Sequence, residues 1–223
     1  MDDQTLRQQL ETVLHKTLPD CQLQLSAPPL CPRIKLALLA PTLPTAPLPH
    51  ETMLKVLETP AYWSFCWASG QVLASYLRQH PEIVADRRVV DFGAGSGIVG
   101  IAAKLAGAAE VLAIDSDPDA LAACRINAAL NNVTLKTLSG LSDLRANADL
   151  IIAADVLYDR DNFPLLDELP KLARRVLIAD SRIKQFSHPC YQRIGEQTAT
   201  TWPDLEEHPE YNLVRIFESI LSG

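Results

Sequence analysis

Glycine and paired cysteines are scarce in this chain of 223 residues, and each shortage is informative. Of nine glycines, four fall within eight positions: Gly93, Gly95, Gly97 and Gly100. Such clustering marks one backbone site. The five cysteines contain no Cys-x-x-Cys pair, and their odd number argues against a disulfide framework. We therefore expect a reducing compartment, the cytoplasm.

Positive charge and long apolar runs are also missing. The chain has 20 Lys and Arg against 27 Asp and Glu, a formal net charge of −7. Binding the nucleic-acid backbone requires a basic face, so no nucleic-acid partner is expected. No run reaches the roughly 18 apolar residues of a membrane span, and the start, Met-Asp-Asp-Gln, is unlike a signal or transit peptide. Hydrophobic residues make up 48%, enough for a substantial core.

Prolines gather near the start of the chain, with nine of the sixteen between Pro19 and Pro60. Before them, residues 3–18 carry leucines at helical spacing, with Asp2 or Asp3 available as the N-cap. A short strand is expected at 33–38 and a short helix at 51–58. We predict that residues 1–60 form a helical and irregular extension packed on a core domain of residues 61–223.

From residue 88 onward, strand and helix patterns alternate. Strands are expected around 89–90 and at 110–114, 133–138, 149–154 and 175–179, and helices at 70–80, 98–105, 118–130 and 164–173. This alternation predicts a doubly wound, Rossmann-like α/β fold with a mostly parallel sheet. The β-rich runs at 197–202 and 211–217 have no room for a helix between them. We expect them to form an antiparallel C-terminal hairpin that completes a seven-stranded sheet.

Residues 89–100 read Val-Val-Asp-Phe-Gly-Ala-Gly-Ser-Gly-Ile-Val-Gly and join the first regular strand to its helix. Read from Gly95, the spacing satisfies the dinucleotide fingerprint, with Asp115 twenty residues later as a ribose-binding acid. Read from Asp91, it is Asp-x-Gly-x-Gly-x-Gly, which resembles the loop of class I S-adenosylmethionine methyltransferases. An acid at the strand end suits the ammonium group of a methionine moiety and would repel a pyrophosphate. We favour the second interpretation, and NAD binding is the alternative.

Other catalytic patterns are absent. Ser96 is flanked at two residues' distance by Ala94 and Ile98, so it is not a Gly-x-Ser-x-Gly nucleophile. The five histidines show no zinc-ligand spacing, and no metal is expected. No Walker pattern occurs.

Further segments resemble one subgroup of these methyltransferases. They are the Asp-Val-Leu-Tyr at 155–158, the aromatic stretch 61–71, the segment 176–182 after which Gln185 and Phe186 follow, and residues 32–36. The chain is similar in these segments to the electron-transfer-flavoprotein β-subunit lysine methyltransferases, relatives of the ribosomal-protein methyltransferases. The resemblance implies S-adenosylmethionine as cofactor. It assigns cofactor binding to Trp67, Gly70, Asp91, Gly93, Gly95, Gly97, Asp115, Ser116 and Asp155.

The same resemblance implies methyl transfer to a lysine of a protein substrate, such as electron-transfer flavoprotein β-subunit or a ribosomal protein. Asp155 would orient the amine and Tyr158 would line its channel, whereas their structural alternatives are helix capping and packing. Asp159 and Asp161 form an acidic rim suited to a lysine-bearing partner. Methylation of a small-molecule amine and a non-catalytic cofactor-binding module are the competing functions.

Overall fold

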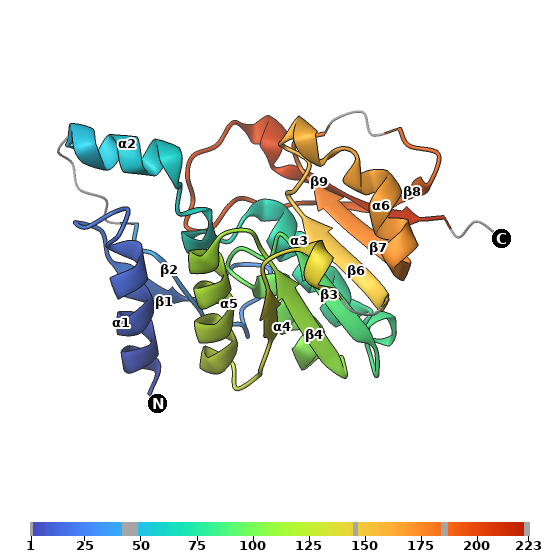
Figure 1. Ribbon diagram of the computed structural model, residues 1–223, viewed down its shortest axis with the longest axis horizontal. Helices are drawn as coiled ribbons and strands as arrows, with labels where there is room; N and C mark the ends of the chain where they lie inside the picture. The colour runs from blue at the N-terminus through green and yellow to red at the C-terminus, as the bar shows by residue number, and fades with distance from the viewer. Residues whose placement is uncertain (1, 42–48, 145–146, 184–186, 221–223) are drawn as a thin grey trace.

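The computed structural model describes residues 2–41, 49–144, 147–183 and 187–220 and contains a central sheet of seven strands (Figure 1). The strands are β3 (Arg88–Phe92), β4 (Glu110–Ile114), β5 (Lys136–Leu138), β6 (Ala148–Ala154), β7 (Ala173–Asp180), β8 (Tyr191–Thr198) and β9 (Leu213–Ser219). Their order is β5-β4-β3-β6-β7-β9-β8. The pairs from β5 to β7 are parallel, and β9 is antiparallel to both β7 and β8. The predicted doubly wound sheet with an antiparallel hairpin is confirmed.

Helices cover both faces of this sheet, which explains its nearly continuous apolar strands. The helices are α3 (Ala68–Gln79), α4 (Ile98–Leu105), α5 (Pro118–Leu130) and α6 (Leu165–Leu172). Val89 and Leu150 lie in the buried cluster that includes α3 and α4, whereas Val90 and Ile151 pack with Leu166 of α6. Successive strand residues therefore point to opposite helical layers.

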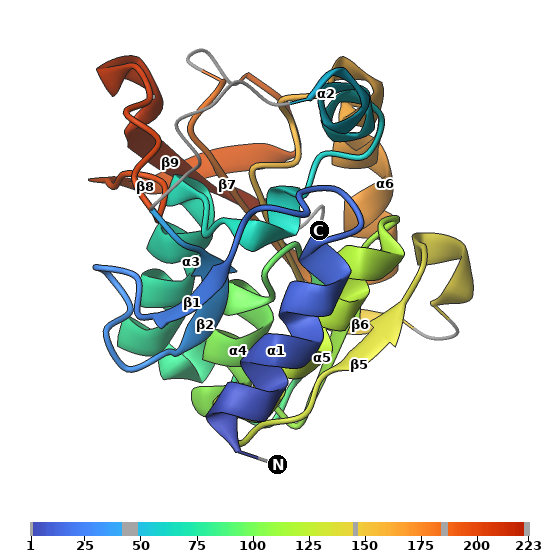
Figure 2. The ribbon, with the colours of Figure 1, turned by 90° about the vertical axis from the view of Figure 1, so that its left-hand side faces the viewer.

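The first part of the chain packs against α5 through α1 (Asp3–Leu14) and β2 (Leu36–Leu39) (Figure 2). Its other elements are β1 (Leu23–Ser26) and α2 (His50–Glu58). Asp2 caps α1, because its side chain accepts a hydrogen bond from Thr5 N. Strands β1 and β2 pair as an antiparallel hairpin. The sequence predicted only the second of these strands, and the domain division at residue 60 stays a prediction.

The predicted position of the penultimate strand is wrong. Strand β8 begins at Tyr191, six residues before the predicted start, and ends at Thr198. It is an edge strand with mostly polar, solvent-facing side chains, so it lacks the apolar pattern that a sequence reading detects. The following residues leave the ladder, and Trp202 instead forms an isolated bridge with Cys66. Strand β5 is also shorter than expected, since it begins at Lys136.

Short 3-10 helices complete the described structure. They are η1 (Tyr62–Ser64), η2 (Pro81–Ile83), η3 (Leu141–Asp143), η4 (Arg160–Asn162) and η5 (Pro209–Tyr211). Among the described residues, none of the helices has both the length and the apolar character needed to cross a membrane.

Candidate active site

The candidate site lies at the carboxyl ends of β3 and β6, which are neighbours in the sheet. The chain proceeds outward from β3 to β5 on one side and from β6 to β7 on the other, so the strand order reverses between β3 and β6. Ligands of open α/β sheets bind at such a switch point. The loops after the two strands touch here: a Cβ placed on Gly93 would lie 2.6 Å from Cγ1 of Val156. The topology thus brings the glycine-rich loop and the segment 155–158 together.

The glycine-rich loop between β3 and α4 depends on backbone conformations that other residues avoid. Gly93, Gly95 and Gly97 have φ angles of +67°, +51° and +81°. The amide groups of Gly93 and Ala94 both donate to Ile114 O, at 2.9 and 3.1 Å, which fixes the start of the loop against β4. A Cβ on Gly95 would meet nothing within 4 Å. The loop therefore presents bare backbone to open space, where a ligand can approach closely.

Asp91 is buried under this loop, within β3. Its Oδ2 accepts a hydrogen bond of 2.7 Å from Gly100 N, so the carboxyl group holds the first turn of α4. Burial raises the pKa of Asp91 to about 8; the bond from Gly100 opposes this shift and the nearby Asp115 adds to it. Gly100 is required there because a Cβ would lie 2.9 Å from Asp91 Oδ2. The predicted contact of Asp91 with a ligand ammonium stays a prediction.

Asp115 follows β4 and faces the glycine-rich loop. Its Oδ2 accepts from Gly95 N at 2.9 Å and its Oδ1 from Asp117 N at 3.0 Å. Burial raises the pKa of Asp115, and these backbone hydrogen bonds act against the shift. Two of the predicted residues, Asp115 and Gly95, are thus joined directly, with the exposed Ser116 beside them. Both carboxylate oxygens have a fixed direction before any ligand arrives.

Asp155 follows β6 and has a left-handed backbone, with φ of +51°. Its Oδ1 accepts from Ser69 Oγ at 2.6 Å and from Ser181 Oγ at 3.2 Å, and its Oδ2 accepts from Ser69 N at 3.1 Å. Because Ser69 lies in the first turn of α3, Asp155 caps that helix from another part of the chain. Burial and the nearby Asp180 carboxyl raise the pKa of Asp155 to about 6. The structure thus confirms the capping alternative, and the catalytic role remains a prediction.

An aromatic row lies beside Asp155. The Tyr158 ring, 59% exposed, is 6.2 Å from the Tyr62 ring, which in turn is 5.8 Å from the Trp67 ring. Both ring pairs are edge-to-face, and Trp67 Nε1 donates to Tyr62 O at 3.0 Å. Tyr62 therefore connects the two predicted residues, Trp67 and Tyr158. Nothing in the sequence pattern distinguished Tyr62 from its aromatic neighbours.

Gly70 lies inside α3 and is buried, whereas the sequence placed it at the start of the helix. A Cβ at this position would lie 3.2 Å from Ile98 Cγ2, so Gly70 lets α3 approach α4 closely. Its structural role is helix packing, and its predicted contact with a cofactor stays a prediction.

The sequence reading missed four residues that organise this site: Ser69, Ser181, Asp180 and Asn127. Oδ1 of Asp180, the last residue of β7, accepts from the amide groups of the two residues that follow Ser181. Asn127 is buried in α5; its Nδ2 donates to Ser96 O and its Oδ1 accepts from Ala37 N, both at 2.9 Å. A polar residue at a strand end, or on a buried helix face, is the signal that could have identified them.

Known proteins are similar to this chain in sequence. The sequence profile of the family described as "Ribosomal protein L11 methyltransferase (PrmA)" matches residues 71–160. The electron transfer flavoprotein beta subunit lysine methyltransferase of Rattus norvegicus is 35% identical over 155 residues, which cover 64% of this chain and 60% of that protein. Its counterpart in Danio rerio is 43% identical over 166 residues, covering 68% and 62%. The chain thus matches about three-fifths of the length of these relatives.

A solved structure agrees with this assignment. The ribosomal protein L11 methylase of Lactobacillus delbrueckii subsp. bulgaricus superposes with a TM-score of 0.52 at 26% identity, covering 68% of this chain and 77% of that one. The resemblance expected from the sequence is confirmed. The chain has the class I S-adenosylmethionine-dependent methyltransferase fold, and it is a sequence relative of the electron-transfer-flavoprotein β-subunit lysine methyltransferases.

Proposed function

We propose that this protein is an S-adenosylmethionine-dependent methyltransferase that methylates a lysine side chain of a protein substrate. The observation that carries the proposal is the contact between the glycine-rich loop and Val156, in the middle of the segment 155–158. This contact puts a candidate donor site and a candidate acceptor site side by side. The lysine methyltransferases among the sequence relatives support the choice of acceptor.

The residues at the glycine-rich loop fit this cofactor. Gly95 offers unobstructed backbone, and the Asp115 carboxylate beside it has the two oxygens that a ribose diol requires. Asp91, in the strand that leads into the loop, could meet the ammonium of the methionine moiety. We assign ribose binding to Asp115 and ammonium binding to Asp91. Trp67, Gly70 and Ser116 complete the proposed cofactor-binding set with the glycines and Asp155.

S-adenosylmethionine supplies an electrophilic methyl group when it is bound. The acceptor amine must be neutral to attack, and deprotonating a lysine with a pKa near 10.4 costs about 4.6 kcal/mol at pH 7. Asp155 would hold the amine through a hydrogen bond to its carboxylate, whose direction is fixed by Ser69 and Ser181. Tyr158 and Tyr62 would line the approach and exclude water.

The surface beside this approach suits a basic protein segment. Asp159 and Asp161, in the turn at η4, are exposed and lie one and three residues after Tyr158 in the sequence. Carboxylates there would attract a partner that presents lysine. We propose electron-transfer flavoprotein β-subunit or a ribosomal protein as the substrate, because the relatives carry those names.

Labelling tests the substrate class. The purified chain would be incubated with methyl-labelled S-adenosylmethionine and a cell lysate, and separately with each purified candidate substrate. We expect a labelled protein band, with mass spectrometry locating the methyl group on a lysine. Label confined to small molecules would reject the protein substrate in favour of a small amine.

Calorimetry tests the cofactor independently of the substrate. We expect S-adenosylmethionine to bind and NAD not to bind, since the acid at Asp91 disfavours a pyrophosphate. Tight NAD binding would overturn the assignment. Cofactor binding without methyl transfer to any lysate component would instead support the non-catalytic module.

A further inference from the structure

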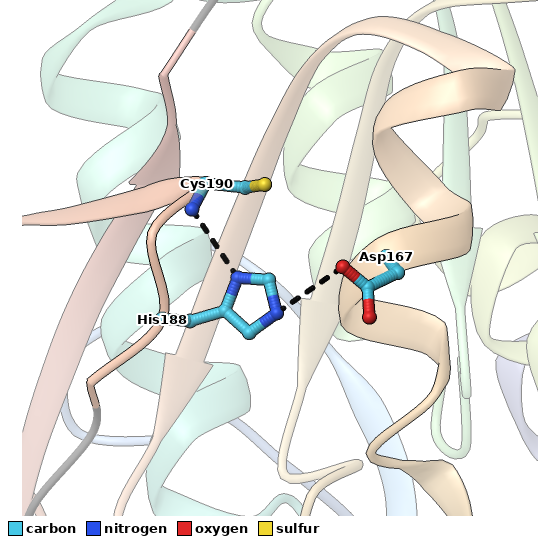
Figure 3. Close-up of side chains that lie close together, drawn as sticks. All are labelled: Asp167, His188 and Cys190. Atoms are coloured by element: carbon cyan, nitrogen blue, oxygen red, sulfur yellow. Dashed lines mark hydrogen bonds and ion pairs between the residues drawn. The ribbon is translucent and has the colours of Figure 1, made fainter.

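A second cluster of reactive side chains lies away from the carboxyl edge of β3 and β6. Asp167 of α6 faces His188 and Cys190, which belong to the turn that leads into β8 (Figure 3). One ligand atom from each residue lies within 4.8 Å of the other two. We propose that this Asp–His–Cys cluster binds a divalent cation that prefers a thiolate and an imidazole, of the Zn²⁺ class.

The donor atoms and their spacing suit tetrahedral Zn²⁺. Cysteine sulfur, histidine nitrogen and a carboxylate oxygen are its usual ligands, with bonds of about 2.0 to 2.3 Å. Ligand atoms at the corners of such a tetrahedron lie roughly 3.3 Å apart or slightly more. The distance from His188 Nε2 to Asp167 Oδ1 is 3.4 Å, so these two ligands already have that separation. The ligand atoms of all three residues lie within 4.8 Å of one another, so closing the cluster on a metal requires movements of about 1.5 Å or less. A fourth position would be taken by water.

The turn that carries two of the ligands is well defined. Tyr191 N donates to His188 O at 3.1 Å, and Pro189 occupies the second position of this turn. Ile220 N donates to Cys190 O at 2.7 Å, which ties the turn to the end of β9. The His188 ring packs edge-to-face on Tyr191, with ring centres 5.5 Å apart. The backbone of the turn and the packing of the ring on Tyr191 are therefore set by contacts that a metal would not disturb.

Other histidine–carboxylate pairs in the described structure differ from this one. His80 with Glu82, at 3.3 Å, and His208 with Glu210, at 3.7 Å, each join residues two positions apart in the sequence. Neither belongs to a group of three possible ligands within the described residues. The His188 pair connects a helix to a distant turn and adds a thiol. A sequence search for zinc spacing misses it, because Asp167 comes from another element.

Binding has a defined chemical consequence. The Cys190 thiol releases its proton to solvent, and the metal takes the place of a proton at His188 Nε2. The ring proton then resides on Nδ1, so the 3.3 Å hydrogen bond from Cys190 N to Nδ1 is given up. In exchange, α6 becomes fastened to the connection between β7 and β8. Ser181, which contacts Asp155, lies at the start of that connection.

Cobalt provides the spectroscopic test, because Co²⁺ substitutes for Zn²⁺ and absorbs visible light. The full chain, reduced and free of chelator, would be titrated with Co²⁺ and then with Zn²⁺. We expect a thiolate-to-cobalt charge-transfer band and tetrahedral visible bands at one equivalent, both removed by Zn²⁺. The melting temperature should rise with Zn²⁺.

Variants locate the metal. Cys190→Ser should abolish the charge-transfer band, and His188→Gln and Asp167→Asn should each weaken Co²⁺ binding at least tenfold. His208→Gln is the matched control and should bind as the unaltered chain does. The proposal is overturned if no band forms, or if the band survives in both Cys190→Ser and His188→Gln. Far-ultraviolet circular dichroism on each variant separates lost binding from lost folding.

Discussion

Asp155 caps α3 and is also proposed to bind the acceptor amine. Its pKa of about 6 allows these two roles to be tested separately. Below pH 6 the Asp155 carboxyl group becomes protonated, and one of its two oxygens then carries a hydrogen. That oxygen can no longer accept a hydrogen bond from the amine as a carboxylate oxygen does. The acceptor lysine must also lose a proton before it attacks. This requirement by itself makes log kcat/KM rise with pH with a slope of one. We therefore predict a slope of one between pH 6 and 8 and a slope of two below pH 6, measured by initial rates of methyl transfer.

The Asp155→Asn variant is the companion to that profile. An amide oxygen can still accept from Ser69 N, so the variant should fold and bind cofactor. Its rate should fall by about 10² to 10⁴, the usual contribution of a positioned acid or base, and its slope should stay at one below pH 6. A variant with full activity would leave Asp155 only its capping role.

Asp91 is predicted to change its protonation when cofactor binds. Burial raises its pKa to about 8, so at pH 7 the free protein holds it mostly protonated. A ligand ammonium stabilises the carboxylate and lowers that pKa, and a proton should leave. Calorimetry in two buffers of different ionisation enthalpy should show release approaching one proton per cofactor. Asp91→Asn should release almost none; equal release in both proteins would remove Asp91 from ammonium binding.

The raised pKa of Asp91 also has a consequence for folding. A carboxyl group whose pKa rises from 3.8 to about 8 on folding favours the folded state fully below pH 3.8. That stabilisation declines as the pH rises and is lost above about pH 8. An uncharged amide side chain in its place can keep the bond from Gly100 N at every pH. The Asp91→Asn variant should therefore show a smaller decline in urea-unfolding free energy between pH 5 and 8.

At the scale of the element, the glycine-rich loop has positions with different constraints. Gly95→Ala adds a Cβ that meets no protein atom, at the modest cost of about 1 kcal/mol for a left-handed alanine. Gly93→Ala adds the same strain and places its Cβ 2.6 Å from Val156 Cγ1. We predict that Gly95→Ala lowers cofactor affinity at least tenfold with a small loss of stability. Gly93→Ala should lose about 2 to 4 kcal/mol of stability.

The control for these variants is Gly107→Ala. Gly107 also has a left-handed backbone, with φ of +98°, and its Cβ would lie at an ordinary 3.8 Å from Ala85. It follows α4 and precedes β4, at the opposite end of both elements from the glycine-rich loop. The Gly107→Ala variant should lose about as much stability as Gly95→Ala, while calorimetry shows that its cofactor affinity is unchanged. If Gly95→Ala and Gly107→Ala lose cofactor affinity equally, the loss results from backbone strain and not from the space that the added Cβ occupies.

The sequence predicted those elements whose side chains face a core. Strands β4, β6 and β7 have apolar runs because helices cover both faces, and their positions were correct within a few residues. Strand β8 faces solvent along most of its length and was misplaced. Its neighbours Thr200 and Thr201 have high β-propensity, yet Thr200 O instead accepts from Gln71 at 2.6 Å.

The residues of the candidate site also divide into those that the sequence predicted and those that it missed. Asp91, Asp115 and Asp155 were predicted because each lies at or next to the carboxyl end of an apolar strand, and strand ends meet at one edge of a parallel sheet. Ser69 and Ser181 were not, because their importance arises from hydrogen bonds to Asp155 across long stretches of chain. A polar residue at a strand end or on a buried helix face marks a candidate, but the local pattern does not show which distant residue it contacts.

At the scale of the whole molecule, Asn127 connects the N-terminal extension to the glycine-rich loop. The side-chain amide of Asn127 accepts a hydrogen bond from Ala37 N of β2 and donates one to Ser96 O of the loop. Asn127 is fully buried. Asn131, one turn later, accepts from Lys35 N at 2.9 Å and donates to Lys35 O at 2.6 Å. Leu10 of α1 packs in the same cluster as Leu130 of α5. The extension is therefore bonded to the helix that supports the cofactor loop.

These contacts predict that the extension and the core unfold together. Residues 1–60 contain no Trp, Tyr or Phe, so tryptophan fluorescence reports only on the rest of the chain. Cys21 and Cys31 are buried and report on the extension through thiol labelling, with Cys66 as the buried thiol of the core. We expect one urea midpoint for fluorescence and for the labelling of all three thiols, resolved by mass spectrometry.

Unfolding of the extension at lower urea than the core would be an equally specific result. Cys31 lies in one apolar cluster with Cys66 and Val72, and its thiol donates to Gln71 O at 3.6 Å. Freeing Cys31 therefore opens the packing around α3, whose first turn Asp155 caps. If Cys21 and Cys31 were labelled at lower urea than Cys66, the extension would be a separate folding unit and the division at residue 60 a true domain boundary. Coincident midpoints would instead make the extension part of the fold that holds the site.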